Sequence, residues 1–181
     1  MTVQKEKMIL DWMRKIHQME YAHRYQSLYY VKAERWLGIS AFFITTLIAF
    51  SYRFPKIKSD EFQQLPFVFK QEFFVPFASF AAAILTGLIT FLRPSERSET
   101  HKKTGSNYEK LRHRIELLIT SQLAEIQLDK ELAEIKDEWD SLDSINVSNR
   151  YFLRGKAKIN SFNKYPKELD FLVDVEKANN S

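Results

Sequence analysis

Hydrophobic residues are concentrated in two uncharged blocks, and the rest of the chain is polar and highly charged. The first block covers residues 36–52 and the second covers residues 73–92. At about 1.5 Å per residue, helices of these lengths would measure roughly 25 Å and 30 Å, close to the hydrocarbon thickness of a bilayer. The pattern therefore predicts a hairpin of two membrane-spanning helices (segment 36–92), with residues 53–72 as an external loop.

Two other interpretations fit the blocks less well. Two buried core helices of a soluble domain are one, but a chain of 181 residues has little sequence left to cover both blocks on every side. A cleaved signal peptide is the other, but a long polar stretch precedes the first block and no small-residue cleavage site follows it. The first block is short for a span, so aromatic and basic neighbours would have to complete it: Tyr29, Tyr30, Lys32, Arg35, Arg53 and Phe54.

Lysine and arginine are more frequent on the outer flanks of the two blocks than between them. Residues 16–35 and 93–112 together hold nine, and residues 53–72 hold four. Because positively charged residues near a span favour the cytoplasmic side, this count predicts that both termini are cytoplasmic.

Residues 4–34 contain no glycine or proline and place apolar and aromatic side chains near helical spacing. The stripe consists of Met8, Trp12, Met19 and Tyr29, widened by Ile16, His23 and Tyr30. This spacing predicts that segment 1–35 is an amphipathic cytosolic helix that continues into the first span. Such a helix could lie on the bilayer or pack on another cytosolic helix.

Segment 93–143 is predicted to hold a juxtamembrane turn and then a long cytosolic helix. Pro94 and the serines after it favour a kink, and Ser106 with Glu109 forms a capping box that would start a new helix. Apolar residues then recur every three or four positions: Leu111, Ile115, Leu118, Leu123, Ile126, Leu132, Ile135, Trp139 and Leu142. The heptad register slips around residues 127–130, which favours a bundle helix over a long coiled coil. The predicted fold class is therefore an all-α membrane protein, a two-transmembrane hairpin whose cytosolic helices form a helical bundle.

Segment 144–181 is basic, and its periodicity is weaker. Six cations and no acid fall between residues 150 and 167: Arg150, Arg154, Lys156, Lys158, Lys164 and Lys167. Such a cluster can bind anionic lipid headgroups or nucleic acid. A solvated connector before a short final helix over residues 167–177 is the other interpretation.

Composition and motifs give no support for an enzyme. The chain has no cysteine, which excludes disulfides, thiol nucleophiles and cysteine-ligated metals. Its four histidines lack the spacing of a metal site, and phosphate-binding and nucleophile-elbow motifs are missing, so no metal, cofactor or catalytic residue is predicted. Glu99 and His101 follow the second span, where they either fix the exit of that helix or form a pH-sensitive gating contact.

The second span has two different faces. Small and weakly polar residues share one side: Ser79, Ala83, Thr86 and Thr90. Bulky residues line the opposite side: Phe77, Phe80, Ile84, Leu88 and Phe91. The small face is predicted either to pack on another helix, with hydroxyls bonded to their own backbone, or to line a pore when several subunits assemble. Neither span contains Asp or Glu, so such a pore would be weakly selective.

The first span carries a strip of small residues. Its members are Gly38, Ala41, Thr45 and Ala49. Small residues let two helix backbones approach closely, so this strip is predicted to pack against the second span of the same chain.

Five short motifs follow one another along residues 8–145. They are Tyr21-Ala22-His23-Arg24-Tyr25, Trp36-Leu37-Gly38-Ile39, Phe91-Leu92, Glu99-Thr100-His101, and Tyr108 with Leu111, Arg112, Arg114, Ile115 and Glu116. Their order and spacing resemble those of the SLATT family, the SMODS- and SLOG-associating two-transmembrane effector domains. The family offers no catalytic residue to carry over.

The resemblance implies a prokaryotic antiviral defence effector, a multi-pass protein of the cell inner membrane. Such effectors are thought to form homo-oligomers and to permeabilise or depolarise the membrane in abortive infection. A genomically linked partner is implied as well: a sensor, a nucleotidyltransferase or a reverse transcriptase. The alternatives are a non-conducting membrane anchor or scaffold for a cytosolic partner protein, and an ordinary two-span ion channel. The channel is disfavoured because the chain lacks a TVGYG filter and an acidic ring.

Overall fold

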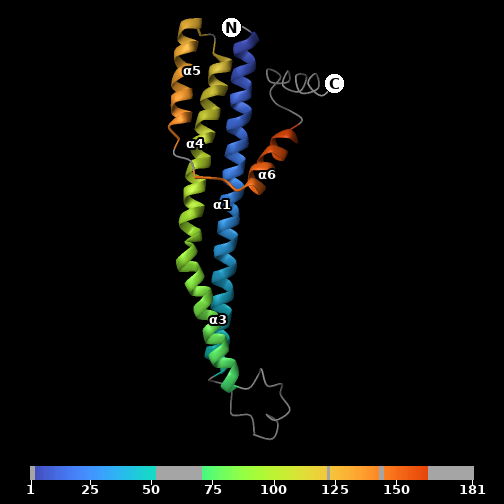
Figure 1. The fold of residues 1–181 in the computed structure, drawn as a ribbon, viewed down its shortest axis with the longest axis vertical. Helices are drawn as coiled ribbons and strands as arrows, with labels where there is room; N and C mark the ends of the chain where they lie inside the picture. The colour runs from blue at the N-terminus through green and yellow to red at the C-terminus, as the bar shows by residue number, and fades with distance from the viewer. Residues whose placement is uncertain (1–2, 52–70, 122, 143–144, 163–181) are drawn as a thin grey trace. The chain divides into compact units, whose positions relative to one another are not determined.

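The computed structural model describes residues 3–51, 71–121, 123–142 and 145–162. Across these ranges the regular structure is helical without any strand, which confirms the all-α prediction (Figure 1). The helices are α1 (Val3–Ser51), α3 (Gln71–Leu92), α4 (Pro94–Thr120), α5 (Glu125–Asp140) and α6 (Asn149–Asn160). They belong to two compact units: unit 1 contains Met1–Leu28 and Ser98–Ser181, and unit 2 contains Tyr29–Arg97. Residues 53–70 of the predicted loop and the predicted final helix over 167–177 lie outside the described residues.

One uninterrupted helix, α1, confirms that the N-terminal helix continues into the first apolar block. It contains no proline, so every backbone N–H after the first turn can donate to the preceding turn. Its buried side is rotated by about one position from the predicted stripe, since Met8 and Tyr29 are exposed whereas Ile9 and Met13 are buried. The buried positions advance by alternating steps of four and three residues, and they avoid the aromatic residues that the prediction emphasised.

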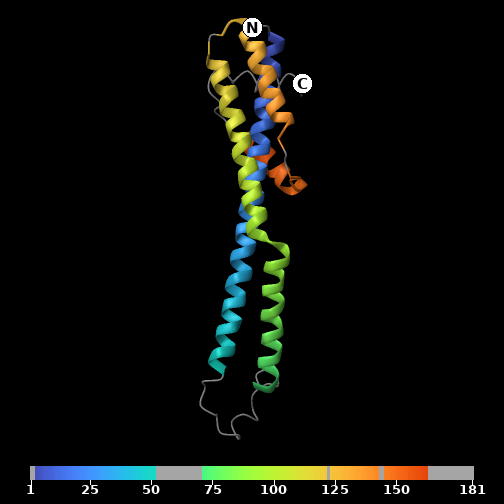
Figure 2. The same ribbon diagram turned by 90° about the vertical axis from the view of Figure 1, so that its left-hand side faces the viewer.

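In unit 1, the first half of α1 packs with α4 and α5 around an apolar core (Figures 1 and 2). The buried core residues are Ile9, Leu10, Met13, Ile16, Tyr108, Leu111, Ile115, Leu118, Leu128, Leu132 and Ile135. Trp12 and Trp139 meet edge to face beside them, with ring centroids 6.0 Å apart. The amphipathic part of α1 therefore packs on other helices of its own chain, and removal of these side chains from water is the main force that holds unit 1 together.

Ion pairs at the margin of this core fix the register of α5. Lys5 of α1 pairs with Glu125 at 3.2 Å and with Asp129 at 2.7 Å. Arg114 of α4 pairs with three glutamates of α5, at 2.7–3.0 Å: Glu131, Glu134 and Glu138. One guanidinium facing a row of acids is geometrically specific even where each pair, being partly exposed, stabilises little.

The predicted long cytosolic helix is wrong in both its start and its length. The helix begins at Pro94 rather than after the capping box, because proline suits the first turn of a helix, and residues 105–109 lie inside it. It ends at Thr120, and the chain turns before α5 begins at Glu125. Continued straight, the three-and-four spacing after Leu118 would place Gln122, Glu125 and Asp129 in the core; a turn brings Leu128 there instead.

Hydroxyl groups support that turn. Thr120 Oγ1 donates to the carbonyls of Glu116 and Leu117, and Ser121 Oγ donates to the carbonyl of Leu118. These bonds satisfy or compete for carbonyls that a continuing helix would use. Leu123 and Ile126, which the sequence placed on the buried stripe, are exposed as a result.

Residues 149–160 of the basic C-terminal segment form a helix, α6, rather than a solvated connector. Tyr151, Gly155 and Ile159 follow one another at four-residue intervals and form the buried side of α6. Gly155 lies against α1 so closely that a Cβ atom there would be 2.7 Å from the Gln18 carbonyl oxygen and 3.0 Å from the Ala22 nitrogen. Glycine is thus required for the contact, which the weak periodicity of this segment concealed.

In unit 2, α3 lies alongside the second half of α1 (Figure 2). Its most buried residues are Ala78 and Ala82, each 7% exposed, and they share one side with half-buried Val75, Leu85 and Ile89. We call these five residues the contact stripe. Aromatic side chains point away from it: Phe77 is 74% exposed and Phe91 is 84% exposed. The break between α3 and α4 is a single residue, Arg93, with a positive φ of 44°.

The Gly155 contact predicts a specific effect of a single methyl group. Gly155→Ala should loosen α6 from α1 and cost about 1–3 kcal/mol of docking free energy, because neither nearby backbone atom can move aside. Hydrogen exchange of the α6 amides measures this directly. Gly105→Ala is the matched control: its Cβ would meet its nearest neighbours at 3.5 Å, an ordinary contact, so exchange should stay unchanged or slow. Equal behaviour of the two variants would contradict the close approach.

Candidate functional site

A layer of polar side chains is buried between α1 and α4 in unit 1. Each of its members is no more than 7% exposed: Glu20, His23, Gln26 and Ser27 of α1 and Ser98, His101 and Thr104 of α4. We call this set the polar layer. It follows the apolar core directly along both helices, and its members stand where the helix spacing requires buried side chains. Polar groups are costly to bury without partners, so the pairing of each one matters.

Two histidines meet at the centre of the polar layer. His23 Nδ1 and His101 Nδ1 are 3.0 Å apart, and the ring of Tyr108 stacks on His23 with centroids 5.6 Å apart. For a hydrogen bond, one Nδ1 must carry a hydrogen and donate it, and the other Nδ1 must be unprotonated and accept. The contact therefore requires at least one neutral ring. The remaining nitrogen of His23, Nε2, is buried without a hydrogen-bond partner among the described residues.

Burial keeps this pair neutral. Loss of solvent, together with the nearby charge of protonated His101, lowers the pKa of His23 to about 4. Burial also lowers the pKa of His101. Both rings are therefore neutral at pH 7, and protonation of both would turn the hydrogen bond into a contact of two donors. Within the described part of the chain, no cluster of three or more acidic or histidine side chains could hold a metal ion.

Two serines and a glycine bring α1 and α4 close together on either side of the histidines. Ser27 Oγ and Ser98 Oγ are 3.0 Å apart, and Ser98 Oγ also donates to the Ser27 carbonyl at 3.2 Å. Gly105 faces the Glu20 carbonyl, where a Cβ atom would fit at 3.5 Å. Small side chains thus bring the two helices close enough for a hydroxyl group of one to form a hydrogen bond with the backbone of the other.

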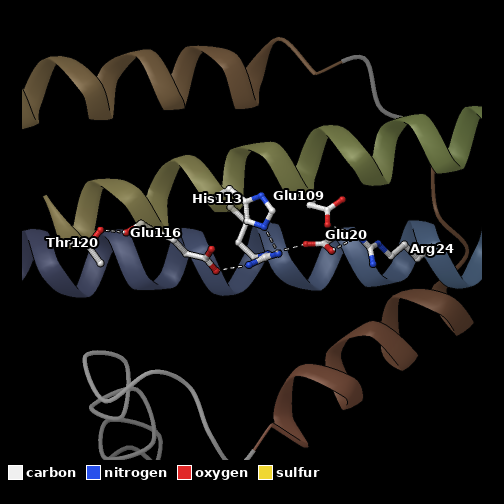
Figure 3. A network of polar contacts seen from close by, with 7 residues as sticks. Glu20, Arg24, Glu109, His113, Glu116 and Thr120 are labelled. Carbon is white, nitrogen blue, oxygen red and sulfur yellow. Dashed lines mark hydrogen bonds and ion pairs between the residues drawn. The ribbon is translucent and has the colours of Figure 1, made fainter.

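A charged network continues the polar layer toward the apolar core (Figure 3). Glu20 accepts from Arg112 of α4 at 3.0 Å and pairs with Arg24 of its own helix at 3.1 Å. Arg24 reaches across to Glu109 at 2.8 Å, and Arg112 also pairs with Glu116. Burial alone would lower the pKa of Arg112, but the hydrogen bond and charge of Glu20 outweigh it and raise that pKa. The guanidinium of Arg112 is therefore held in its ionised form.

The predicted gating pair is divided by the structure. His101 is buried in the polar layer, whereas Glu99 is exposed. Glu99 is therefore no partner of His101 inside the layer, and the side chain that meets His101 is His23. Two residues apart on a helix, Glu99 and His101 point to different sides, which explains the division.

The predicted small face of α3 is uncovered. Ser79, Ala83, Thr86 and Thr90 are all exposed in unit 2; we call them the threonine face. They lie about 100° round the helix from the contact stripe, so α1 does not cover them. Part of this face, with Gly87, forms an open hollow that Phe91 and Arg93 border. Thr86 Oγ1 donates to the Ala82 carbonyl at 2.9 Å, and Thr90 Oγ1 donates to the Thr86 carbonyl at 3.1 Å.

The small-residue strip of the first span does not form the predicted close contact within unit 2. Thr45 and Ala49 are exposed, and a Cβ atom added at Gly38 would meet nothing within 4 Å. Gly38 and Ala41 are half-buried, but the half-buried side of the helix continues through Leu37 and other large residues. The prediction failed because small-residue spacing alone does not say which side of a helix faces its neighbour. The close approach is instead made by alanines of α3.

The four cations predicted as a basic patch all lie on α6. Arg150, Arg154 and Lys156 are exposed, and Lys158 is half-buried. Arg154 lies over the ring of Tyr25 at 4.6 Å, and Lys158 lies 5.1 Å from the ring of Phe162. These contacts hold the side chains on unit 1 without neutralising them.

Comparison with family models, curated proteins and solved structures finds no match to this chain. The comparisons thus supply no family, and the likeness to SLATT domains rests on the sequence motifs alone.

Sequence reasoning missed the polar layer, although a signal for it exists. The steps from Ile9 through Ile16 continue to Glu20, His23 and Ser27 at the same three-and-four spacing, so polar residues occupy positions that should be buried. A polar residue in such a position predicts a buried partner. The identity of that partner, 78 positions away for His23, is not contained in a single sequence.

The histidine pair predicts that unit 1 loses stability in acid. The folded-state pKa of His23, about 4, lies below the unfolded value of 6.5, so the unfolded chain binds the proton first as the pH falls. Stability is fully present above pH 6.5 and decreases toward pH 4. We expect the melting temperature in detergent micelles to fall by several degrees between pH 7 and pH 5.

His23→Gln should reduce this acid sensitivity. His17 contributes in the same direction, since burial and the charges of Arg112 and Arg24 lower its pKa to about 4, so part of the effect will remain. His113→Gln controls for the loss of an imidazole outside the pair, because His113 is exposed on α4 and lies 3.0 Å from Arg112. An unchanged pH dependence in His23→Gln would show that the pair does not titrate with folding.

Glu20 and Glu109 both pair with Arg24, but the charged network predicts that their removal lowers the stability of unit 1 by different amounts. Glu20→Ala should destabilise unit 1 by about 1–3 kcal/mol, because it leaves a largely buried Arg112 with only half-exposed Glu116 and exposed His113 as partners. Glu109→Ala removes a pair whose arginine is 44% exposed and should cost less than about 1 kcal/mol. Thermal unfolding of both variants measures the difference. The double variant Glu20→Met with Arg112→Met should recover part of the loss, and equal costs for both glutamates would contradict the assignment.

Proposed function

We propose that this chain is a two-span protein of the prokaryotic inner membrane. Two of its helices are long and apolar enough to cross a bilayer, and their most apolar windows are 0% and 11% buried. Large apolar side chains such as Phe42 and Phe77 stand exposed there, which would be unfavourable in water and is favourable among acyl chains. The lysine and arginine count supports cytoplasmic termini, with unit 1 in the cytosol.

Within that membrane, the protein acts as an effector of antiviral defence that assembles into homo-oligomers and permeabilises the bilayer. The observation that supports this proposal is that the threonine face of α3 is exposed, whereas the neighbouring contact stripe is already buried within unit 2. Copies can therefore bring their threonine faces together without opening the hairpin, while Phe77 and Phe80 face lipid. The likeness to SLATT domains supports the biological setting and a genomically linked sensor as the trigger.

A non-conducting membrane anchor is the second candidate, and one observation favours it. Thr86 and Thr90 satisfy their hydroxyl hydrogens on their own helix, as threonines facing lipid must do. In that case the hairpin would only hold unit 1 at the membrane for a cytosolic partner protein.

Replacing Thr86 and Thr90 together by leucine distinguishes the two candidates. In the pore hypothesis, the double variant still assembles but dye leakage from proteoliposomes and killing of an expressing bacterial host fall at least tenfold, because a wet path becomes apolar. Thr45→Leu is the matched control, since Thr45 is also exposed and also bonds its own backbone, but lies on α1. Full leakage and killing by the double variant would remove the threonine face from the mechanism. Absence of leakage and killing by the unchanged protein, with partner binding retained in the double variant, would support the anchor.

A further inference from the structure

The helix α6 concentrates positive charge. Its 12 residues include four cations and no acid: Arg150, Arg154, Lys156 and Lys158. Some cations of unit 1, such as Lys5 and Arg112, pair with carboxylates, whereas none of these four forms an ion pair with another described residue. No carboxylate of the described residues therefore neutralises the positive charge of α6.

Apolar side chains lie among these cations. At 100° per residue, Leu153 is almost diametrically opposite the buried Gly155, and it is 54% exposed. Arg150 and Lys156 flank it on its two sides, and Phe152, 37% exposed, lies next to Lys156. A leucine at the centre of an exposed face with long cationic side chains around it is typical of helices that lie on an anionic bilayer surface.

The face is also held rigidly. Gly155 seats α6 on α1, and Ser148 N–H, just before the helix, donates to Gln26 Oε1 at 2.9 Å. The guanidinium of Arg154 rests on Tyr25, which keeps it in place without consuming its charge. Preorganised cations lose little conformational entropy when they bind.

We propose that this outer face of α6 binds the anionic headgroups of the membrane that holds the two spans. The inference rests on the proposed membrane location but not on pore formation. Anchored spans keep unit 1 at a high effective concentration next to phosphate headgroups, so a modest intrinsic affinity is enough. Nucleic acid could bind the same cations, but its binding would leave the exposed Leu153 and Phe152 unexplained. An anionic bilayer surface can contact both the cations and the apolar side chains.

The test uses the full chain in lipid nanodiscs. Amide hydrogen exchange of residues 149–160 is compared in discs of phosphatidylcholine alone and in discs with about a third phosphatidylglycerol. We expect exchange to be several-fold slower with the anionic lipid, and the difference to disappear at high salt. Arg150→Glu with Lys156→Glu should abolish it, and Leu153→Ser should weaken it at constant charge.

Two exposed lysines provide the matched control. Lys110→Glu with Lys130→Glu removes the same charge from α4 and α5 and should leave the lipid effect intact. The neutral pair Arg150→Gln with Lys156→Gln, which should also lose the effect, guards against local unfolding by the charge reversal.

The outcomes separate this inference from the proposed function. Equal exchange in both kinds of disc, for protein that has inserted, overturns the headgroup contact and leaves pore formation to its own test. Slower exchange with an added RNA oligonucleotide but not with anionic lipid also overturns it and assigns the face to nucleic acid. Protein that fails to enter either disc contradicts the membrane location itself.

Discussion

A single seam along α1, in which steps of four and three residues alternate, determines what each part of the molecule can pack against. This spacing keeps a line of side chains facing the same neighbour over a long helix. The chemistry of the line changes along the chain: apolar from Ile9 to Ile16, polar from Glu20 to Ser27, and uncharged and mostly apolar from Leu37 onward. The first two stretches face partners in unit 1, and the third faces α3 in unit 2. One backbone geometry thus serves three different environments.

The polar stretch is the part of the seam that admits the fewest partners. Leucines there would gain more from burial than an ion pair that must first be stripped of water. Glu20, His23 and Ser27 each need a polar partner when they are buried. The helix α4 supplies these partners at compatible spacing, as Arg112, His101 and Ser98. A shift of α4 by one turn would leave several of these groups buried and unpaired, at a cost of about 1–3 kcal/mol each. The layer therefore fixes register more than it adds stability, and neutral histidines make that register sensitive to acid.

Patterns within one helix were readable from the sequence, and contacts between helices were not. The two apolar blocks, the continuity of α1 and the break near Pro94 follow from local composition and proline chemistry. The turn after Thr120 left only one sign in the sequence, the register slip near Leu128. The chain turns there because the turn brings Leu128 into the core, and the position of that core depends on other helices. The meeting of His23 with His101, and the seat of Gly155 on α1, depend on approach between segments that no single-chain periodicity encodes.

The hydroxyl bonds of α3 bear on what a path along the threonine face would conduct. Thr86 and Thr90 each give their hydrogen to a carbonyl four residues back, so their oxygens keep lone pairs directed away from the helix. If copies assemble with these faces inward, the path presents acceptors and no fixed negative charge. Acceptors favour cations weakly, but Arg93, which borders the same hollow and is only partly balanced by Glu96 at 3.3 Å, adds positive charge at its end and opposes them. The two influences act against each other, which suits a lesion that collapses the membrane potential better than a channel that must choose its ion.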